Sequence, residues 1–300
     1  GNLGKGDFNV FRMFVELALG IVRPNGRASQ VIPEGIYNGA NCMKIREHLL
    51  EDCLLHSVLG FENQRHVWFE GVDTRTKFAI YVAQIPGRTD VVRAAFNIRS
   101  QAELAAILHG GGLSLPVALI REFSPDALAL MELGSQRDID IASKMYATHP
   151  KFGDEIAGWP RRHYMAEVHM GNDRGLFSEN PGGIPLYEGR MVTAYDHRAK
   201  GYRSGRGRKA DWVDLPFGDP SKAILPQWYV AAENVPQKVL ERFQSYRVGF
   251  CNVASPTNER TLVATIVPPY VVCGDKVPTI CFHDARAWHL AVWLAVANSF

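Results

Sequence analysis

The chain has 300 residues, of which 46% are hydrophobic, and its charged side chains leave a formal net charge of +2. This apolar content is enough for one large or two modest globular domains, and the near-neutral charge excludes a chain that binds polyanions over its whole surface. The five cysteines are scattered and form no Cys-x-x-Cys pair. This spacing argues against a disulfide framework and a structural zinc site, and it favours a reducing compartment.

Neither a membrane span nor a metal site is expected. No signal peptide opens the chain, and its longest apolar run, residues 288–297, is interrupted by His289 and covers about half of a bilayer. We therefore expect a cytoplasmic location and no membrane partner. The histidines lack the spacing typical of zinc ligands, and the carboxylates between residues 138 and 155 flank a predicted helix. We expect no metal.

The first part of the chain predicts helices and strands in alternation. A polar turn follows the first helix, and an aromatic, charged loop at residues 67–77 separates the last two strands. This region is too short to close a sheet of its own. The predicted elements are a helix at 10–22, a strand at 28–33, a helix at 40–53 and strands at 54–61 and 78–85.

Proline and glycine mark two boundaries, near residues 85–87 and in residues 148–153. Between them, apolar residues at helical spacing predict helices over residues 102–108 and 125–146, which form a helical connector. From Trp159 onward, short β-type runs such as residues 164–168 and 261–267 alternate with polar and glycine-rich loops, and the apolar run 288–297 predicts a buried helix. This texture indicates an irregular α/β module.

Three motifs in the first part carry a family resemblance. They are residues 6–16 with the turn Pro24-Asn25-Gly26, residues 31–35, and Phe61-Glu62-Asn63 followed by residues 68–75. In series they resemble the C-terminal half of the catalytic domain of gamma-class (TaqI-like) DNA adenine-N6 methyltransferases. The resemblance implies a partial Rossmann-like methyltransferase sheet and S-adenosylmethionine as the cofactor.

The rest of the family's catalytic motifs precede the region represented here. The sequence contains no Asn/Asp-Pro-Pro-aromatic motif, and Gly110-Gly111-Gly112 does not follow a convincing strand. We therefore expect a fragment that is inactive alone and binds S-adenosylmethionine only weakly. Its implied partner is the missing N-terminal half of the methyltransferase domain.

Two interpretations apply to the first helix. The resemblance implies that Val10 and Phe14 line the pocket for the cofactor's adenine ring. Alternatively, Val10, Phe14, Leu17 and Ile21 form a stripe at helical spacing that is buried against the sheet.

The loop at 67–77 contains the residue that the resemblance assigns to the target base. Phe69 matches the family's aromatic that stacks on the flipped adenine, although Glu70 stands where the family has proline. Trp68 is the alternative stacking residue. A loop aromatic beside His66 and Arg75 is also compatible with a purely structural role in the core.

The second part resembles the target-recognition region of large combined restriction–modification enzymes. The resemblance rests on Gly171-Asn172-Asp173 and on residues 185–192, 195–198 and 257–269. It implies double-stranded DNA as a partner, with Arg190 among the contacts. Between these motifs lies one dense basic tract, spaced by glycines at 201, 205 and 207. It predicts a flexible loop that follows a phosphate backbone or reads guanine edges. The alternative is a loop that is merely solvated. Its cations are Arg198, Lys200, Arg203, Arg206, Arg208 and Lys209.

The sequence thus predicts an α/β chain with the end of a methyltransferase domain (1–95), a helical connector (96–155) and a DNA target-recognition domain (156–300). The predicted function is site-specific DNA adenine-N6 methylation in a restriction–modification or phage-defence system, with base flipping. Two alternatives remain: a non-catalytic DNA-specificity module, and a methyltransferase of similar fold that acts on RNA or protein.

Overall fold

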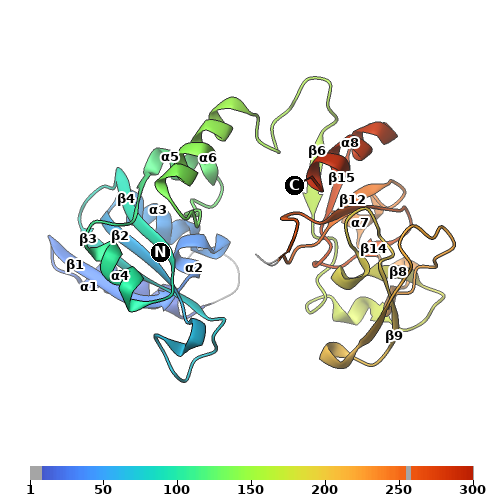
Figure 1. The fold of residues 1–300 in the computed structure, drawn as a ribbon, viewed down its shortest axis with the longest axis horizontal. Coiled ribbons are helices and arrows are strands. Elements are labelled where there is room, and N and C mark those ends of the chain that lie inside the picture. Colours follow the sequence, from blue (N-terminus) through green and yellow to red (C-terminus); the bar gives the residue numbers. More distant parts are fainter. Residues whose placement is uncertain (1–8, 255–257, 300) are drawn as a thin grey trace. The chain divides into compact units, whose positions relative to one another are not determined.

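The structure is a computed structural model that describes residues 9–254 and 258–299, except for the side chain of Arg208. Parts of two motifs, residues 6–8 and Thr257, lie outside the described residues. The chain is mixed α/β, as predicted, and divides into two compact units, residues 1–150 and 151–300 (Figure 1).

The first unit is built on a five-stranded sheet in the order β1-β3-β2-β4-β5. Strand β3 runs antiparallel to both β1 and β2, whereas β2 and β4 are parallel. The strands are β1 (Gly26–Pro33), β2 (Leu54–Glu62), β3 (Lys77–Ile85), β4 (Val91–Ile98) and β5 (Leu113–Pro116). The helices are α1 (Phe11–Ile21), α2 (Gly35–Asn38), α3 (Met43–Glu51), α4 (Gln101–Leu108), α5 (Val117–Phe123) and α6 (Gln136–Thr148).

The predicted helix, strand, helix, strand, strand order of the first part is confirmed. Strand β1 pairs with β3 along its whole length, from Gly26 opposite Ile85 to Pro33 opposite Phe78. Among the described residues it pairs with no strand on its other side, so β1 is an edge strand eight residues long. An exposed edge of this length presents unpaired backbone N–H and C=O groups to a further strand.

The predicted connector does not stand apart from the first sheet. Strand β5 pairs with β4, and Leu128, Leu130 and Ile139 join the same apolar core as β1 and β2. The chain divides at residues 150 and 151, within the predicted boundary 148–153, whereas the predicted boundary at 85–87 lies inside the first unit.

The long helix predicted over 125–146 begins only at Gln136. Ser135 caps α6 by accepting a hydrogen bond from the Asp138 amide. The preceding residues are not helical, and Leu128 has a left-handed backbone with φ of 52°. Apolar residues in this segment are spaced as in a helix, but the backbone that places Leu128 and Leu130 in the core is not helical.

The second unit contains two four-stranded sheets, β14-β8-β11-β7 and β13-β12-β15-β6, and the hairpin β9–β10. Its strands are β6 (Arg162–Met165), β7 (Phe177–Ser178), β8 (Ile184–Tyr187), β9 (Lys200–Ser204), β10 (Asp211–Asp214), β11 (Trp228–Val230), β12 (Arg247–Phe250), β13 (Ala264–Val267), β14 (Val272–Cys273) and β15 (Thr279–Phe282), and its helices are α7 (Gln237–Leu240) and α8 (Ala287–Ala297).

Helix α8 was predicted to be buried, but only one side of it is. Leu290 and Leu294 pack on the sheet that contains β12 and β13, while Val296 is 68% exposed. Asn298 then fixes the end of the helix, because its buried amide exchanges two hydrogen bonds of 2.9 Å with the backbone of Ala264. None of the described helices is long and apolar enough to cross a membrane.

Candidate functional site

The aromatic loop between β2 and β3 is organised by Asn63, whose side chain is fully buried. The Asn63 amide nitrogen donates to the backbone carbonyls of Phe69 (2.9 Å) and Val72 (3.0 Å). Its oxygen accepts from the backbone N–H groups of Phe69 (2.9 Å) and Trp68 (3.3 Å). One buried side chain therefore satisfies four backbone groups of a loop that extends beyond the sheet (Figure 1).

The two candidate stacking residues, Trp68 and Phe69, differ in how much of their surface contacts the rest of the protein. The Trp68 indole is half-buried, donates to the Ile98 carbonyl at 3.3 Å and meets Phe61 edge to face at 5.1 Å. Phe69 contacts the buried Phe78 edge to face at 5.0 Å but keeps 42% of its surface exposed. Of these two rings, Phe69 is the one with substantial surface available to a ligand.

A charged network lies at the base of this loop. Lys77 Nζ lies 3.4 Å from Glu62 and 2.9 Å from Glu132, and the Tyr37 hydroxyl donates to Glu132 at 2.8 Å. Burial alone lowers the pKa of Lys77, but Glu132 and Glu62 outweigh it and raise that pKa above its usual value. A hydrogen bond from Arg99 lowers the pKa of Glu62 against the opposing effect of burial. Lys77 is therefore charged at neutral pH and joins strand β3 to the segment after α5.

An open cavity of about 600 Å³ adjoins the same network. Arg65, which lines it, and the neighbouring His66 both have a left-handed backbone, with φ of 55° and 57°. Non-glycine residues rarely adopt this conformation, and it is often found at functional sites. The cavity is lined by Glu62, Gln64, Arg65, Thr74, Arg75 and Lys77.

Helix α1 carries apolar side chains on two faces. Val15 and Leu19 are buried in the core, whereas Val10 and Phe14 are 54% and 57% exposed. Leu17 is 57% exposed as well. The alternative in which this second stripe is buried on the sheet is wrong within the described unit, because Val15 and Leu19 occupy that position. Val10 and Phe14 instead form an exposed apolar surface.

The basic tract is a β-hairpin and not the predicted flexible loop. Strands β9 and β10 pair from Lys200 opposite Asp214 to Ser204 opposite Asp211, and a short 3₁₀ turn over Gly207–Lys209 joins them. Tyr202 and Trp212 meet edge to face at 5.6 Å, and Trp212 also packs on the core of the second unit. The paired strands therefore fix the backbone at Lys200 and Arg203, and Arg206 and Lys209 lie at the tip of the hairpin.

Acidic side chains pair with three of the predicted DNA-binding cations. Lys200 lies 2.9 Å from Asp214, Arg203 donates to Asp211 at 2.6 Å, and Arg206 lies 2.6 Å from Glu179. All three pairs are exposed to solvent, so each contributes little to stability and its cation can exchange the carboxylate for a phosphate at small cost.

The remaining predicted cations have different surroundings. Arg198 donates to the backbone carbonyls of Pro220 and Lys222, so it holds a loop in place and is poorly placed for DNA. Arg190 is exposed and lies 3.5 Å from the Ala210 carbonyl at the base of the hairpin tip. Lys209 is exposed, whereas the side chain of Arg208 lies outside the described residues.

Sequence reasoning assigned no role to the polar centre of the second unit. The fully buried Arg247 pairs with the equally buried Glu167 at 3.0 Å, and Glu167 also accepts from the Cys273 amide and the Thr279 hydroxyl at 2.8 Å each. The partners are far apart in sequence, so no local pattern indicated them. Within the described ranges, no group of three or more His, Cys, Asp or Glu side chains is placed to hold a metal ion.

Comparisons with known proteins give only distant structural similarity. No family model matches the chain. No curated protein matches it either. A protein described as the modification subunit of a type I restriction enzyme from Vibrio vulnificus YJ016 is 18% identical over 36% of this chain and 28% of its own, with a TM-score of 0.31.

Two further solved structures are similar at the same level. A type I restriction–modification complex contains a chain that is 15% identical over 49% of this chain and 40% of its own, with a TM-score of 0.31. The type IIG restriction endonuclease BpuSI is 12% identical over 98% of this chain and 39% of its own, with a TM-score of 0.35. The chain thus spans well under half of each of these proteins. Scores of this size do not establish a common family.

Proposed function

We propose that this chain is part of a site-specific DNA adenine-N6 methyltransferase of a restriction–modification system. In this proposal the first unit supplies one wall of the pocket for the flipped adenine, and the second unit recognises the DNA target. The observation that carries it is the exposed ring of Phe69, held at the backbone on both sides by the buried amide of Asn63. A rigidly presented, exposed aromatic is suited to stack on an extruded base.

The energetics fit this role. Extruding a base costs a few kcal/mol of stacking and pairing, and stacking on an aromatic side chain returns roughly 1–3 kcal/mol. If the backbone of Phe69 were mobile, ordering it on binding would cost about 1–2 kcal/mol per residue and would offset part of the stacking energy. Because Asn63 fixes the backbone of Phe69 before any base arrives, little of this ordering remains to be done on binding.

The cofactor site is proposed to be completed by the preceding part of the methyltransferase domain. S-adenosylmethionine would supply the methyl group. The exposed apolar side chains of Val10 and Phe14 fit one wall for its adenine ring, while the motifs for the other walls are absent from this sequence. The open edge of β1 and the exposed stripe of α1 offer hydrogen-bonding groups and apolar surface to that preceding part.

The decisive experiment is a methyl-transfer assay on the complete protein that contains this chain. Labelled S-adenosylmethionine and duplex DNA should give N6-methyladenine, identified by mass spectrometry of the nucleosides, and Phe69→Ala should reduce its formation. Label that appears in RNA or protein instead would contradict DNA as the substrate. Sequence-specific DNA binding without any transfer would favour the second candidate, a DNA-specificity module, which the missing catalytic motifs also favour.

Calorimetric titration of the isolated chain tests the incomplete cofactor site. With only one wall present, we expect no saturable binding of S-adenosylmethionine at micromolar concentrations. Tight binding to the 300-residue chain would show that a full cofactor pocket exists within it and would contradict this part of the proposal.

A further inference from the structure

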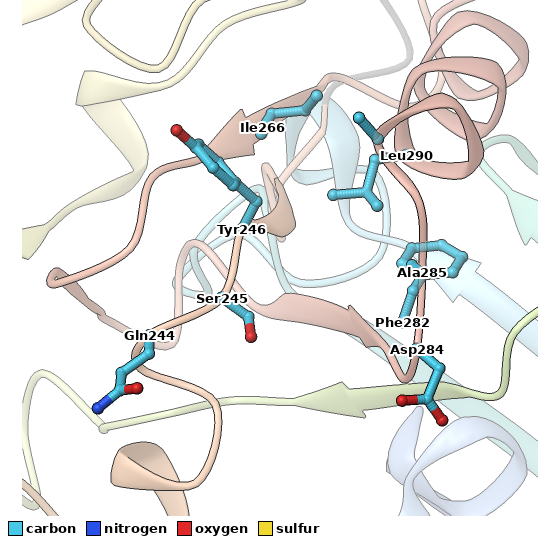
Figure 2. Close-up of a pocket in the computed structure, with 9 residues that line it drawn as sticks. Gln244, Ser245, Tyr246, Ile266, Phe282, Asp284, Ala285 and Leu290 are labelled. Atoms are coloured by element: carbon cyan, nitrogen blue, oxygen red, sulfur yellow. The ribbon is translucent and has the colours of Figure 1, made fainter.

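The second unit contains a cavity of about 540 Å³ that the proposed methyl transfer does not use. Phe282 at the end of β15 and Leu290 in α8 are 9% and 6% exposed, and both belong to the apolar core of this unit. They line the cavity together with Ile266 of β13 and with Ala285 and Ala287. Figure 2 shows Ile266, Phe282, Ala285 and Leu290 around one side of an open space. The volume falls in the range of small-molecule pockets, and the floor is apolar.

Four polar side chains surround this apolar floor: Gln244, Ser245, Tyr246 and Asp284. Tyr246 and Gln244 lie on the side of the opening that faces Phe282 and Asp284 (Figure 2). Among the described residues, none of these four side chains has a hydrogen bond, ion pair or ring contact. Elsewhere in this unit, Asp196 and Asp275 pair with lysines, whereas the exposed carboxylate of Asp284 has no such partner among the described residues.

The backbone presents two of these side chains at the opening of the cavity. Tyr246 is 62% exposed, although it immediately precedes the fully buried Arg247. Asp284 has a left-handed backbone with φ of 55° in the turn between β15 and α8, a conformation that aspartate adopts more readily than most residues with a side chain. Both side chains thus line the cavity without a hydrogen bond, ion pair or ring contact among the described residues.

The chemistry of the lining selects the ligand. An apolar floor that includes the ring of Phe282, with a tyrosine at the rim, suits a planar ring. A carboxylate with no cationic partner accepts N–H donors and repels an anion such as phosphate, and an amide and a hydroxyl add further hydrogen bonds. Aspartate accepts from an exocyclic amine in base recognition. We infer that the cavity binds an unpaired nucleobase that carries an exocyclic amine, as adenine, cytosine and guanine do and thymine does not.

This inference does not depend on methyl transfer, because it concerns only residues 244–290. It places a base-binding site in the second unit, in addition to the proposed stacking on Phe69 in the first. The phosphate groups of the bound nucleotide would lie outside the cavity, away from Asp284.

The test uses the 300-residue chain and a thymine oligonucleotide, single-stranded, with one central 2-aminopurine. Saturable quenching of 2-aminopurine fluorescence is expected, and Tyr246→Ala should weaken it at least about tenfold. The matched control is Tyr164→Ala, which removes a tyrosine that is 51% exposed on β6 and should leave quenching unchanged. Tyr246→Phe should retain it, which separates loss of the ring from misfolding.

Competition then tests the carboxylate. Oligonucleotides with a central adenine or cytosine should displace the 2-aminopurine probe at concentrations at least about tenfold lower than the all-thymine oligonucleotide. Asp284→Asn should abolish this preference. Both measurements are repeated in the Phe69→Ala background, which removes the exposed ring of the first unit. Quenching that remains in this background and is lost on Tyr246→Ala arises in the second unit, whereas quenching that Phe69→Ala alone abolishes would place the base in the first unit. Absent quenching, quenching that survives Tyr246→Ala, or equal competition by thymine would also overturn the inference.

Discussion

The buried side chain of Asn63 forms hydrogen bonds with both backbone polar groups of the exposed residue Phe69. A cyclic contact of this kind fixes the direction in which the Phe69 side chain leaves the backbone. The site proposed for the target base therefore depends on a residue that would not itself touch the base.

Asn63→Ala should loosen this loop without changing the composition of its surface. Removing the amide leaves four backbone groups without their partner, and each buried unsatisfied group costs about 1–3 kcal/mol, less where water reaches it. We expect the free energy of unfolding to fall by about 2 kcal/mol on the same basis. Hydrogen exchange at the amides of Trp68 and Phe69 should accelerate by at least about tenfold.

Asn38→Ala is the matched control, because Asn38 is exposed and makes one long hydrogen bond of 3.4 Å with Glu34. It should change neither the unfolding free energy nor exchange in the loop. Unchanged exchange at Trp68 and Phe69 in Asn63→Ala would show that the loop holds its shape without the amide.

Phe69 and Trp68 should respond to substitution in opposite ways. In the complete protein, Phe69→Ala should weaken binding of a 2-aminopurine target by about 5- to 150-fold, since base stacking contributes roughly 1–3 kcal/mol. Stability should be nearly unchanged. Trp68→Ala should cost up to about 3 kcal/mol of stability, because it removes packing on Phe61. Phe69→Trp should largely retain the fluorescence signal. If Trp68→Ala abolishes that signal and Phe69→Ala does not, Trp68 is the stacking residue.

The β9–β10 hairpin should account for a substantial share of the affinity for duplex DNA. Replacing Arg203, Arg206, Arg208 and Lys209 with alanine should flatten the slope of log affinity against log salt by about two to three, since each phosphate contact contributes roughly 0.9. Fluorescence anisotropy over a salt series measures this slope, preferably in the complete protein.

The acidic partners of these cations give a second test of the hairpin. Asp211→Asn and Glu179→Gln should raise the affinity, because each removes a carboxylate that competes with phosphate for an arginine. Glu155→Gln is the control, because it neutralises a carboxylate that pairs with Arg161 outside the hairpin, and both of these residues are exposed. For the preceding test, equal salt slopes for the wild type and for the fourfold alanine variant of the hairpin cations would show that the hairpin is only a solvated surface.

His197 should make the stability of the second unit depend on pH. Burial, followed by the positive charge of Arg198, lowers the pKa of His197 to about 4, below the value of about 6.5 expected in an unfolded chain. Between these values the unfolded state binds more protons, so this contribution to stability is fully present above about pH 6.5 and is lost as pH falls toward 4. Tyr187 makes a hydrogen bond of 2.6 Å with His197 Nδ1.

Urea unfolding of the wild type and of His197→Gln at several pH values measures this effect. Glutamine can still hydrogen-bond to Tyr187 but does not titrate, so its stability should fall less steeply between pH 6.5 and 4. Parallel curves for the two proteins would assign the acid sensitivity to other groups.

Local pattern in the sequence was sufficient for most elements of the first unit. The apolar runs that became β2 and β3 are short, continuous and bounded by polar residues, which is how a buried strand differs from its surroundings. Helix α4 was predicted from apolar residues at helical spacing. Ser100 caps it by accepting a hydrogen bond from the Glu103 amide. Phe69 was identified because its motif, not its environment, resembles that of a known family.

Tertiary structure decided which of several locally equivalent choices the chain adopts. Helix α1 has apolar residues on two faces, and only packing on the sheet determines that Val15 is buried and Phe14 is exposed. Three cations of the basic tract form ion pairs with Asp211, Asp214 and Glu179. The local sequence pattern does not predict these pairs. Glu132 reaches Lys77 across 55 positions. Periodicity reports spacing along the chain, whereas burial and ion pairing depend on distances in space between residues that the sequence keeps apart.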